Sequence, residues 1–102
     1  LVTLNIRLTD IDTTGLTGTN TLFIRNLPFT NASLVDNQCE GSVRMDLVDV
    51  ATGAYSATFG TQTNNTFGSI RISIDNANDV QLKVQDVTSG SSDIFITVQH
   101  FV

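Results

Sequence analysis

The sequence predicts an all-β domain with antiparallel strands, arranged as a sandwich, a jelly roll or a barrel. The first observation is hydrophobic alternation with a period of two along most of the chain, as in Ile70, Ile72 and Ile74. The second is composition: Thr, Asn and Ser supply 32 of the 102 residues, whereas Glu and Lys occur once each, as Glu40 and Lys83. The third is the spacing of the apolar runs, which leaves no room for the crossovers that parallel strands need.

Seven strands are expected, over 2–10, 20–27, 40–50, 54–60, 66–75, 79–88 and 93–102. The fourth lies between a Thr-Gly and an Asn-Asn turn signal, and the other six carry apolar residues at alternate positions. In chain order, these alternating residues are Val2, Leu4, Ile6 and Leu8; Leu22 and Ile24; Val43, Met45 and Leu47; Ile70, Ile72 and Ile74; Val80, Leu82 and Val84; and Ile94, Ile96 and Val98.

The connections between these strands are rich in Gly, Asn, Asp, Ser and Thr, which favour turns. Two of them, 51–53 and 76–78, are short enough to form hairpins. A chain of 102 residues is expected to form one domain over 1–102, with one hydrophobic core.

Charge and cysteine content exclude several functions. The net charge of −5 argues against nucleic-acid binding, which needs a cationic surface. No stretch approaches the ~18 apolar residues of a membrane span, so no membrane insertion is expected. Because Cys39 is the only cysteine, neither an intrachain disulfide nor a thiolate zinc site can form.

The sequence contains no catalytic signature, so the chain is not expected to be an enzyme. His100 is the only histidine, and no nucleophile motif accompanies it. The acidic turn 75–79 offers oxygen atoms but lacks the ligand order of a calcium loop, which favours an ordinary hairpin. No metal site and no cofactor are therefore predicted.

All five basic residues fall at outward positions of the predicted strands, as Arg25 does. Solvated sheet faces would explain this placement. A subunit contact would also explain it, because large apolar residues share the outward positions and a monomer rarely exposes several aromatics. The candidate oligomer interface consists of Phe23, Arg25, Phe95, His100 and Phe101.

The loops are the candidate receptor-binding regions. Aromatic faces that stack on sugar rings, together with amide and hydroxyl groups, would suit neutral carbohydrate. Alternatively, Tyr55, Phe59 and Phe67 pack into the core and their polar neighbours only form turns. The candidate receptor-binding residues are Tyr55, Thr61, Gln62, Asn64, Asn65, Phe67, Asp36 and Asn37.

The segment 22–32, Leu-Phe-Ile-Arg-Asn-Leu-Pro-Phe-Thr-Asn-Ala, resembles the strand and Leu-Pro-Phe-Thr turn of jelly-roll domains at the C-termini of bacteriophage tail fibres and tailspikes. The segments 42–47 and 94–102 are similar to later strands of that family. The resemblance implies a jelly-roll-like antiparallel β-sandwich, a homotrimer, and a location at the C-terminal tip of a longer fibre protein on the virion. It supplies no fixed set of binding residues.

On this resemblance we expect a tail-fibre tip that binds polysaccharide or an outer-membrane protein on the host bacterial surface. A first alternative is a non-binding structural or assembly domain of a virion or pilus. A second alternative is a fragment of a carbohydrate-active enzyme, which would need clustered carboxylates such as Asp46 or Asp49 in a groove.

Overall fold

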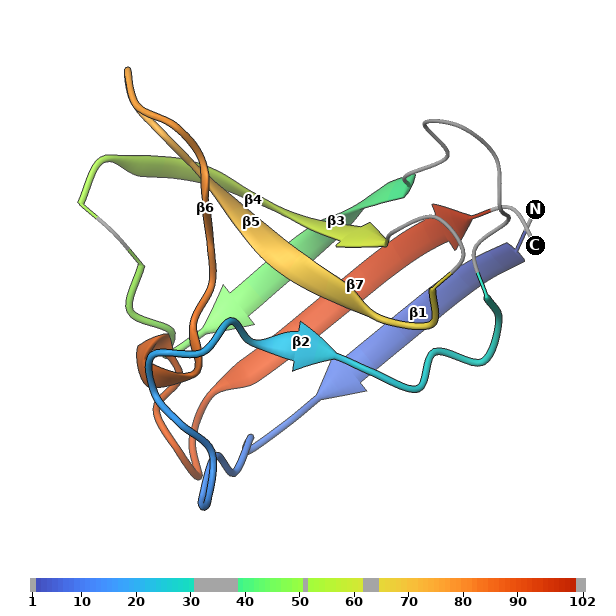
Figure 1. The fold of residues 1–102 in the computed structure, drawn as a ribbon, viewed down its shortest axis with the longest axis horizontal. Coiled ribbons are helices and arrows are strands. Elements are labelled where there is room, and N and C mark those ends of the chain that lie inside the picture. The colour runs from blue at the N-terminus through green and yellow to red at the C-terminus, as the bar shows by residue number, and fades with distance from the viewer. Residues whose placement is uncertain (1, 31–38, 51, 62–64, 101–102) are drawn as a thin grey trace.

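The computed structural model, which describes residues 2–30, 39–50, 52–61 and 65–100, is a curled antiparallel β-sheet (Figure 1). The strand order is β1-β7-β3-β4-β5-β2, and β6 pairs with the same edge of β5 as β2 does. This arrangement confirms the all-β, antiparallel prediction. The strands are β1 (Val2–Leu8), β2 (Phe23–Ile24), β3 (Cys39–Asp46), β4 (Ala54–Thr61), β5 (Gly68–Ile74), β6 (Val80–Gln81) and β7 (Asp93–His100).

Each of the seven predicted ranges contains a strand, but two strands are much shorter than predicted. Within the range 20–27, only β2 forms a strand. Asn26, two residues after β2, adopts a positive φ of 60°, which ends the extended backbone. Within the range 79–88, only β6 forms a strand, and a 3₁₀ turn, η1 (Val84–Asp86), follows it. There the carboxylate of Asp86 accepts a hydrogen bond from the Lys83 amide at 2.9 Å, which favours a turn over a strand.

Strand β3 forms the corner of the curl, because it changes partners along its length. Residues 39–42 pair with β4, whereas Ser42–Asp46 pair with β7. A Cβ atom on Gly41 would lie 2.4 Å from the carbonyl oxygen of Thr97, so only glycine permits this close approach of backbones. The curl therefore depends on glycine at this position.

The two predicted hairpins have different outcomes. The turn at 75–79 joins β5 to β6, with Asn76 in the left-handed region at φ 53°, as predicted for a hairpin. The prediction for 51–53 was wrong. The second half of β3 pairs with β7, so β3 pairs with β4 only at residues 39–42. The segment that connects β3 to β4 instead contacts the chain next to η1, through the bridge Val48↔Val87.

The core lies inside the curl, where β4 and β5 cross over β3 and β7 (Figure 1). The alternation of the sequence places one face of each strand there, and Phe59 is completely buried at its centre. The buried apolar residues of this core are Leu27, Phe59, Ile70, Ile72, Leu82, Ile94, Ile96 and Val98. The outward residues of the same strands form the outer surfaces of the sheet.

Candidate functional site

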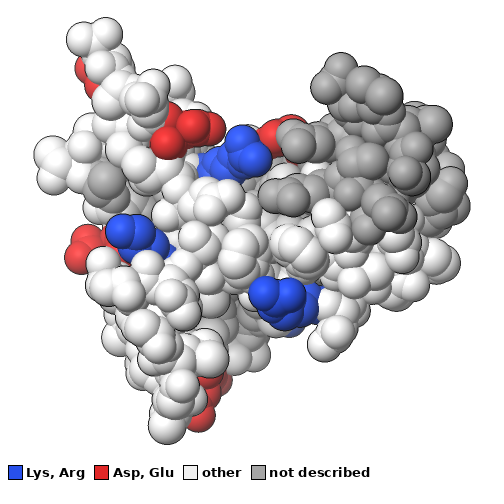
Figure 2. Space-filling model, viewed as in Figure 1, with Lys and Arg blue, Asp and Glu red and all other residues white. Residues whose placement is uncertain are grey.

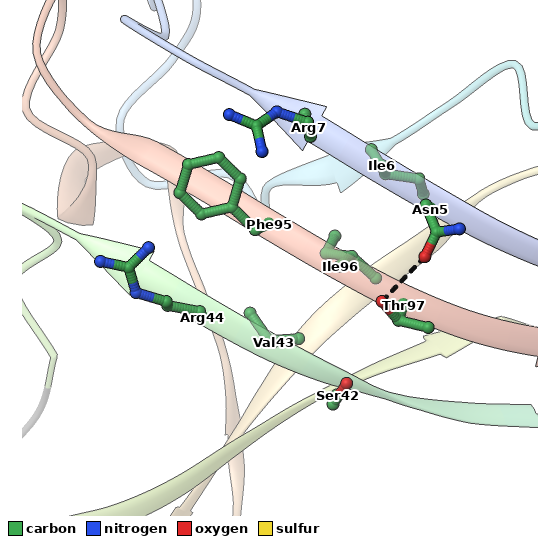
Figure 3. A pocket seen from close by; sticks show the side chains of 9 residues that line it. All are labelled: Asn5, Ile6, Arg7, Ser42, Val43, Arg44, Phe95, Ile96 and Thr97. Carbon is green, nitrogen blue, oxygen red and sulfur yellow. Dashed lines mark hydrogen bonds between the residues drawn. The ribbon is translucent and has the colours of Figure 1, made fainter.

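An aromatic ring with an arginine on each side lies on the outer face of β1, β7 and β3 (Figure 3). The strand register aligns Arg7 and Arg44 with Phe95, which lies on the middle strand. The guanidinium carbon of Arg7 is 4.8 Å from the ring centroid, and that of Arg44 is 5.5 Å from it. Both distances allow cation–π attraction. We call this group the Phe95 cluster.

The sequence places Phe95 outside the core because its neighbours point inward. Ile94 and Ile96 are buried, and successive side chains of a strand point to opposite faces. Arg7 and Arg44 are exposed by the same alternation. Neither guanidinium makes a hydrogen bond or an ion pair with any residue that the structure describes, so their N–H donors are available to a ligand.

A row of hydroxyl and amide groups lies next to the Phe95 cluster, one step further along the strands. It consists of Asn5, Thr97 and Ser42, and the Thr97 hydroxyl donates to the Asn5 side-chain oxygen at 3.0 Å. Together the row and the cluster line an open hollow of about 530 Å³. The surface therefore combines cationic, aromatic and neutral hydrogen-bonding groups (Figure 3).

A second arginine–aromatic group, the Phe23 cluster, lies on the outer face of the other half of the sheet. The rings of Phe23 and Phe67 meet edge to face at 5.3 Å, and the Arg25 guanidinium carbon lies 5.2 and 5.1 Å from the two centroids. Leu22 and Ile24 pack against the core, which turns Phe23 and Arg25 outward. A hollow of about 470 Å³ lies beside it.

The structure does not bring the predicted receptor-binding residues together. Tyr55 is 73% exposed near the start of β4, whereas Thr61 at its end is 1% exposed. At ~3.3 Å per residue, the two lie about 20 Å apart along the strand. Burial removes Thr61 from the receptor-binding candidates, because its side chain shares the inward face with Phe59. Asn65, another receptor-binding candidate, is half-buried.

The remaining receptor-binding candidates are one residue of the Phe23 cluster and four residues outside the described ranges. Phe67 is half-buried within the Phe23 cluster. The other four lie outside the described residues: Gln62, Asn64, Asp36 and Asn37.

The predicted oligomer interface is divided between two surfaces. Phe23 and Arg25 belong to the Phe23 cluster, and Phe95 belongs to the Phe95 cluster on the other half of the sheet. The side chain of His100 and all of Phe101 lie outside the described residues. Sequence reasoning identified Arg7 and Arg44 as outward but did not place them beside Phe95, because that requires the order β1-β7-β3.

The carboxylates form no metal-binding cluster in the described ranges, where no three His, Cys, Asp or Glu residues gather around one point. One carboxylate has a clear structural role. The pKa of Asp12 is lowered, chiefly because its side chain accepts a 2.6 Å hydrogen bond from the Thr14 hydroxyl, with further bonds from the Thr14 amide and the Ser89 hydroxyl. This group fixes a turn.

Comparison with known protein families, curated proteins and solved structures gave no match to this chain. The described residues contain no helix of the length and hydrophobicity that a membrane span requires.

Proposed function

We propose that this chain is a binding module without catalytic activity: the receptor-binding tip of a bacteriophage tail fibre. In this proposal, residues 1–102 form a jelly-roll-like sandwich at the C-terminus of a longer fibre protein. The tip is part of the virion and contacts polysaccharide or an outer-membrane protein on the host cell. The antiparallel fold and the resemblance of segment 22–32 support this proposal.

The observation that carries the proposal is the outer face of β1, β7 and β3. It presents an aromatic ring, two guanidinium groups with available donors, and a neighbouring row of hydroxyl and amide groups. Aromatic and arginine side chains are the residue types that contribute most to recognition surfaces. Figure 2 shows the molecule from the side of β2, β5 and β6, where Lys, Arg, Asp and Glu side chains are scattered among uncharged residues.

Binding of fluorescently labelled protein to a panel of bacterial cells tests this function. We expect saturable binding to the host strain. Added surface polysaccharide would abolish this binding if the receptor is a polysaccharide, and protease treatment of the cells would abolish it if the receptor is an outer-membrane protein. Tyr55→Ala is included because Tyr55 is the most exposed of the receptor-binding candidates that the structure describes. The absence of saturable binding to every strain of a panel that includes the host would contradict the proposal.

The proposed homotrimer is best supported at the Phe23 cluster. Leu16 is 57% exposed and lines the same hollow as Phe23, so apolar surface gathers on this side of the molecule. Exposed apolar patches of this kind favour subunit contacts. The Phe95 cluster lies on the other half of the sheet and would stay accessible to a receptor.

Light scattering at micromolar concentration tests the trimer. We expect a mass of three chains for the wild type and a lower mass for Phe23→Ser. Thr19→Ser, at an exposed position outside the cluster, is the matched control. A monomeric wild type would contradict the proposal.

A separate observation favours a purely structural assembly domain as the second candidate function. Val50 and Val80 are 40% and 43% exposed and line one hollow, and Val50 and Tyr55 line another. Exposed apolar side chains such as Val50 and Val80 favour contact with another subunit. If Val80→Asp abolishes fibre assembly while Arg7→Gln leaves cell attachment unchanged, the assembly function is favoured over receptor binding.

A further inference from the structure

We propose that the Phe95 cluster binds the carboxylate group of an acidic sugar within a polysaccharide. This inference rests on the proposed receptor-binding function and names the chemistry that the receptor would present. The cluster holds two guanidinium groups that have no ion-pair partner among the described residues, with an aromatic ring between them, and it is bordered by the polar row and by acidic residues.

The cluster concentrates positive charge on a protein of net charge −5. From the two ring distances, the guanidinium carbons of Arg7 and Arg44 lie within about 10 Å of each other, roughly the Debye length at 0.1 M salt. Two cations this close repel each other, and no described carboxylate forms an ion pair with either of them. An anion between them would remove that repulsion.

The ring of Phe95 orients both arginines for binding. Contact with an aromatic ring restricts the motion of each guanidinium, yet a ring accepts hydrogen bonds only weakly, so the N–H donors stay free for a stronger acceptor. A planar guanidinium matches a carboxylate with two parallel hydrogen bonds. Because the side chains are already held, less conformational freedom is lost when the anion binds.

The adjacent polar row supplies contacts for the rest of the sugar. A two-residue step along a strand is about 6.6 Å, so Asn5, Thr97 and Ser42 lie about one sugar ring away from the arginines. Hydroxyl and amide side chains both donate and accept hydrogen bonds, as sugar hydroxyls require. The hollow of about 530 Å³ falls within the ~300–1,000 Å³ range of small-ligand sites.

Acidic residues border the cluster and restrict which anions can bind. Asp46 and Asp93 pair across the strands one step beyond the arginines, and Glu40 lies on β3 beyond the polar row. A dense polyanion such as nucleic acid, or an anionic membrane, would meet these carboxylates and be repelled. A chain with single carboxylates separated by neutral hydroxyls fits this charge pattern.

Titration calorimetry of the full chain with oligogalacturonate tests the proposal, with its methyl ester as the uncharged analogue and oligouridylate as the dense polyanion. We expect binding to oligogalacturonate that weakens at higher salt, and at least about tenfold weaker binding by both Arg7→Gln and Arg44→Gln. Arg25→Gln is the matched control, because Arg25 also contacts aromatic rings but belongs to the Phe23 cluster. Circular dichroism verifies that all three variants fold.

Several results would overturn the inference. These are equal binding of the methyl ester, equal weakening by Arg25→Gln, tighter binding of oligouridylate, or no binding to a panel of oligogalacturonate, oligoglucuronate and sialyl oligosaccharides. The cell-attachment assay separates the two proposals. Attachment that survives Arg7→Gln and Arg44→Gln overturns only this site, whereas failure of the wild type to attach to its host overturns the receptor-binding function.

Discussion

The side chain of Ser92 is completely buried and joins three segments of the chain. Its hydroxyl donates to the Leu47 carbonyl at 2.6 Å and accepts from the Thr88 amide at 2.8 Å. Leu47 adopts a positive φ of 57° just beyond the end of β3. The hydroxyl therefore holds an unfavourable backbone conformation against the start of β7.

We expect Ser92→Ala to destabilise the protein by ~1–3 kcal/mol, because two part-buried hydrogen bonds are lost and each is typically worth ~0.5–1.5 kcal/mol. Thermal unfolding measures the loss, at about 4–8 °C per kcal/mol for a domain near this size. Ser91→Ala is the control, since Ser91 is exposed and hydrogen-bonds through its backbone. Equal melting temperatures for the two variants would contradict this role.

Asp12 connects its own turn to Ser89, which lies far along the sequence. Hydrogen bonds from the Thr14 hydroxyl, the Thr14 amide and Ser89 favour the ionised form and lower the pKa of Asp12 below its ordinary value of 3.8. A lowered pKa means that this stabilisation is fully present above pH 3.8 and is lost as the pH falls through the folded-state value.

Thr14→Val is expected to raise the pKa of Asp12 toward 3.8, because it removes the largest cause of the shift. Carboxyl chemical shifts followed by NMR between pH 2 and 6 measure this value in both proteins. The exposed Thr19→Val provides the comparison, since Thr19 does not contact Asp12 in the structure. An unchanged pKa in Thr14→Val would exclude the assigned cause.

At the scale of elements, Gly41 and Gly60 offer a direct test of the corner in β3. A Cβ on Gly41 would lie 2.4 Å from the Thr97 carbonyl oxygen and 2.9 Å from the Val98 Cα. The nearest atom to a Cβ on Gly60 would be 3.5 Å away, which is an ordinary van der Waals contact. We expect Gly41→Ala to cost ~1–3 kcal/mol or more, and Gly60→Ala less than ~0.5 kcal/mol. Urea unfolding of both variants measures the difference, and similar midpoints would show that the corner tolerates a side chain.

The strands were predictable from local patterns because burial of one face imposes a period of two on the sequence. The same period, counted from Phe59, would have placed Thr61 inside the core. The shortening of the range 20–27 was not predictable in this way. It depends on the left-handed backbone of Asn26, which the alternation of neighbouring apolar residues does not reveal.

The candidate site was only partly predictable from the sequence. The alternation within one strand shows which face of the sheet a side chain lies on, but it does not show which strands are neighbours in the sheet. Alternation placed Phe95, Arg7 and Arg44 on outward faces. Their convergence depends on β7 lying between β1 and β3, and these strands are separated by most of the chain. Many pairing orders are compatible with the same alternation, so the cluster became visible only in the structure.

At the scale of the whole molecule, the pairing of the chain's two ends should govern the folding rate. Val2 faces His100 in the β1–β7 register, so nearly the whole chain must close before these strands meet. Domains dominated by such distant pairings fold in milliseconds to seconds. Stopped-flow circular dichroism is expected to show this range, and refolding in microseconds would contradict it.

The β1–β7 pairing also determines how the molecule responds to mechanical force. Its two strands run antiparallel, so tension applied between Val2 and His100 loads the hydrogen bonds of one residue pair at a time and unzips them. Tension along the axis of β1, applied to Val2 while the rest of the sheet is held, loads all seven pairs together in shear. A chain pulled along β1 from its amino end while the rest of the sheet is held would therefore resist unfolding through the stronger of the two geometries.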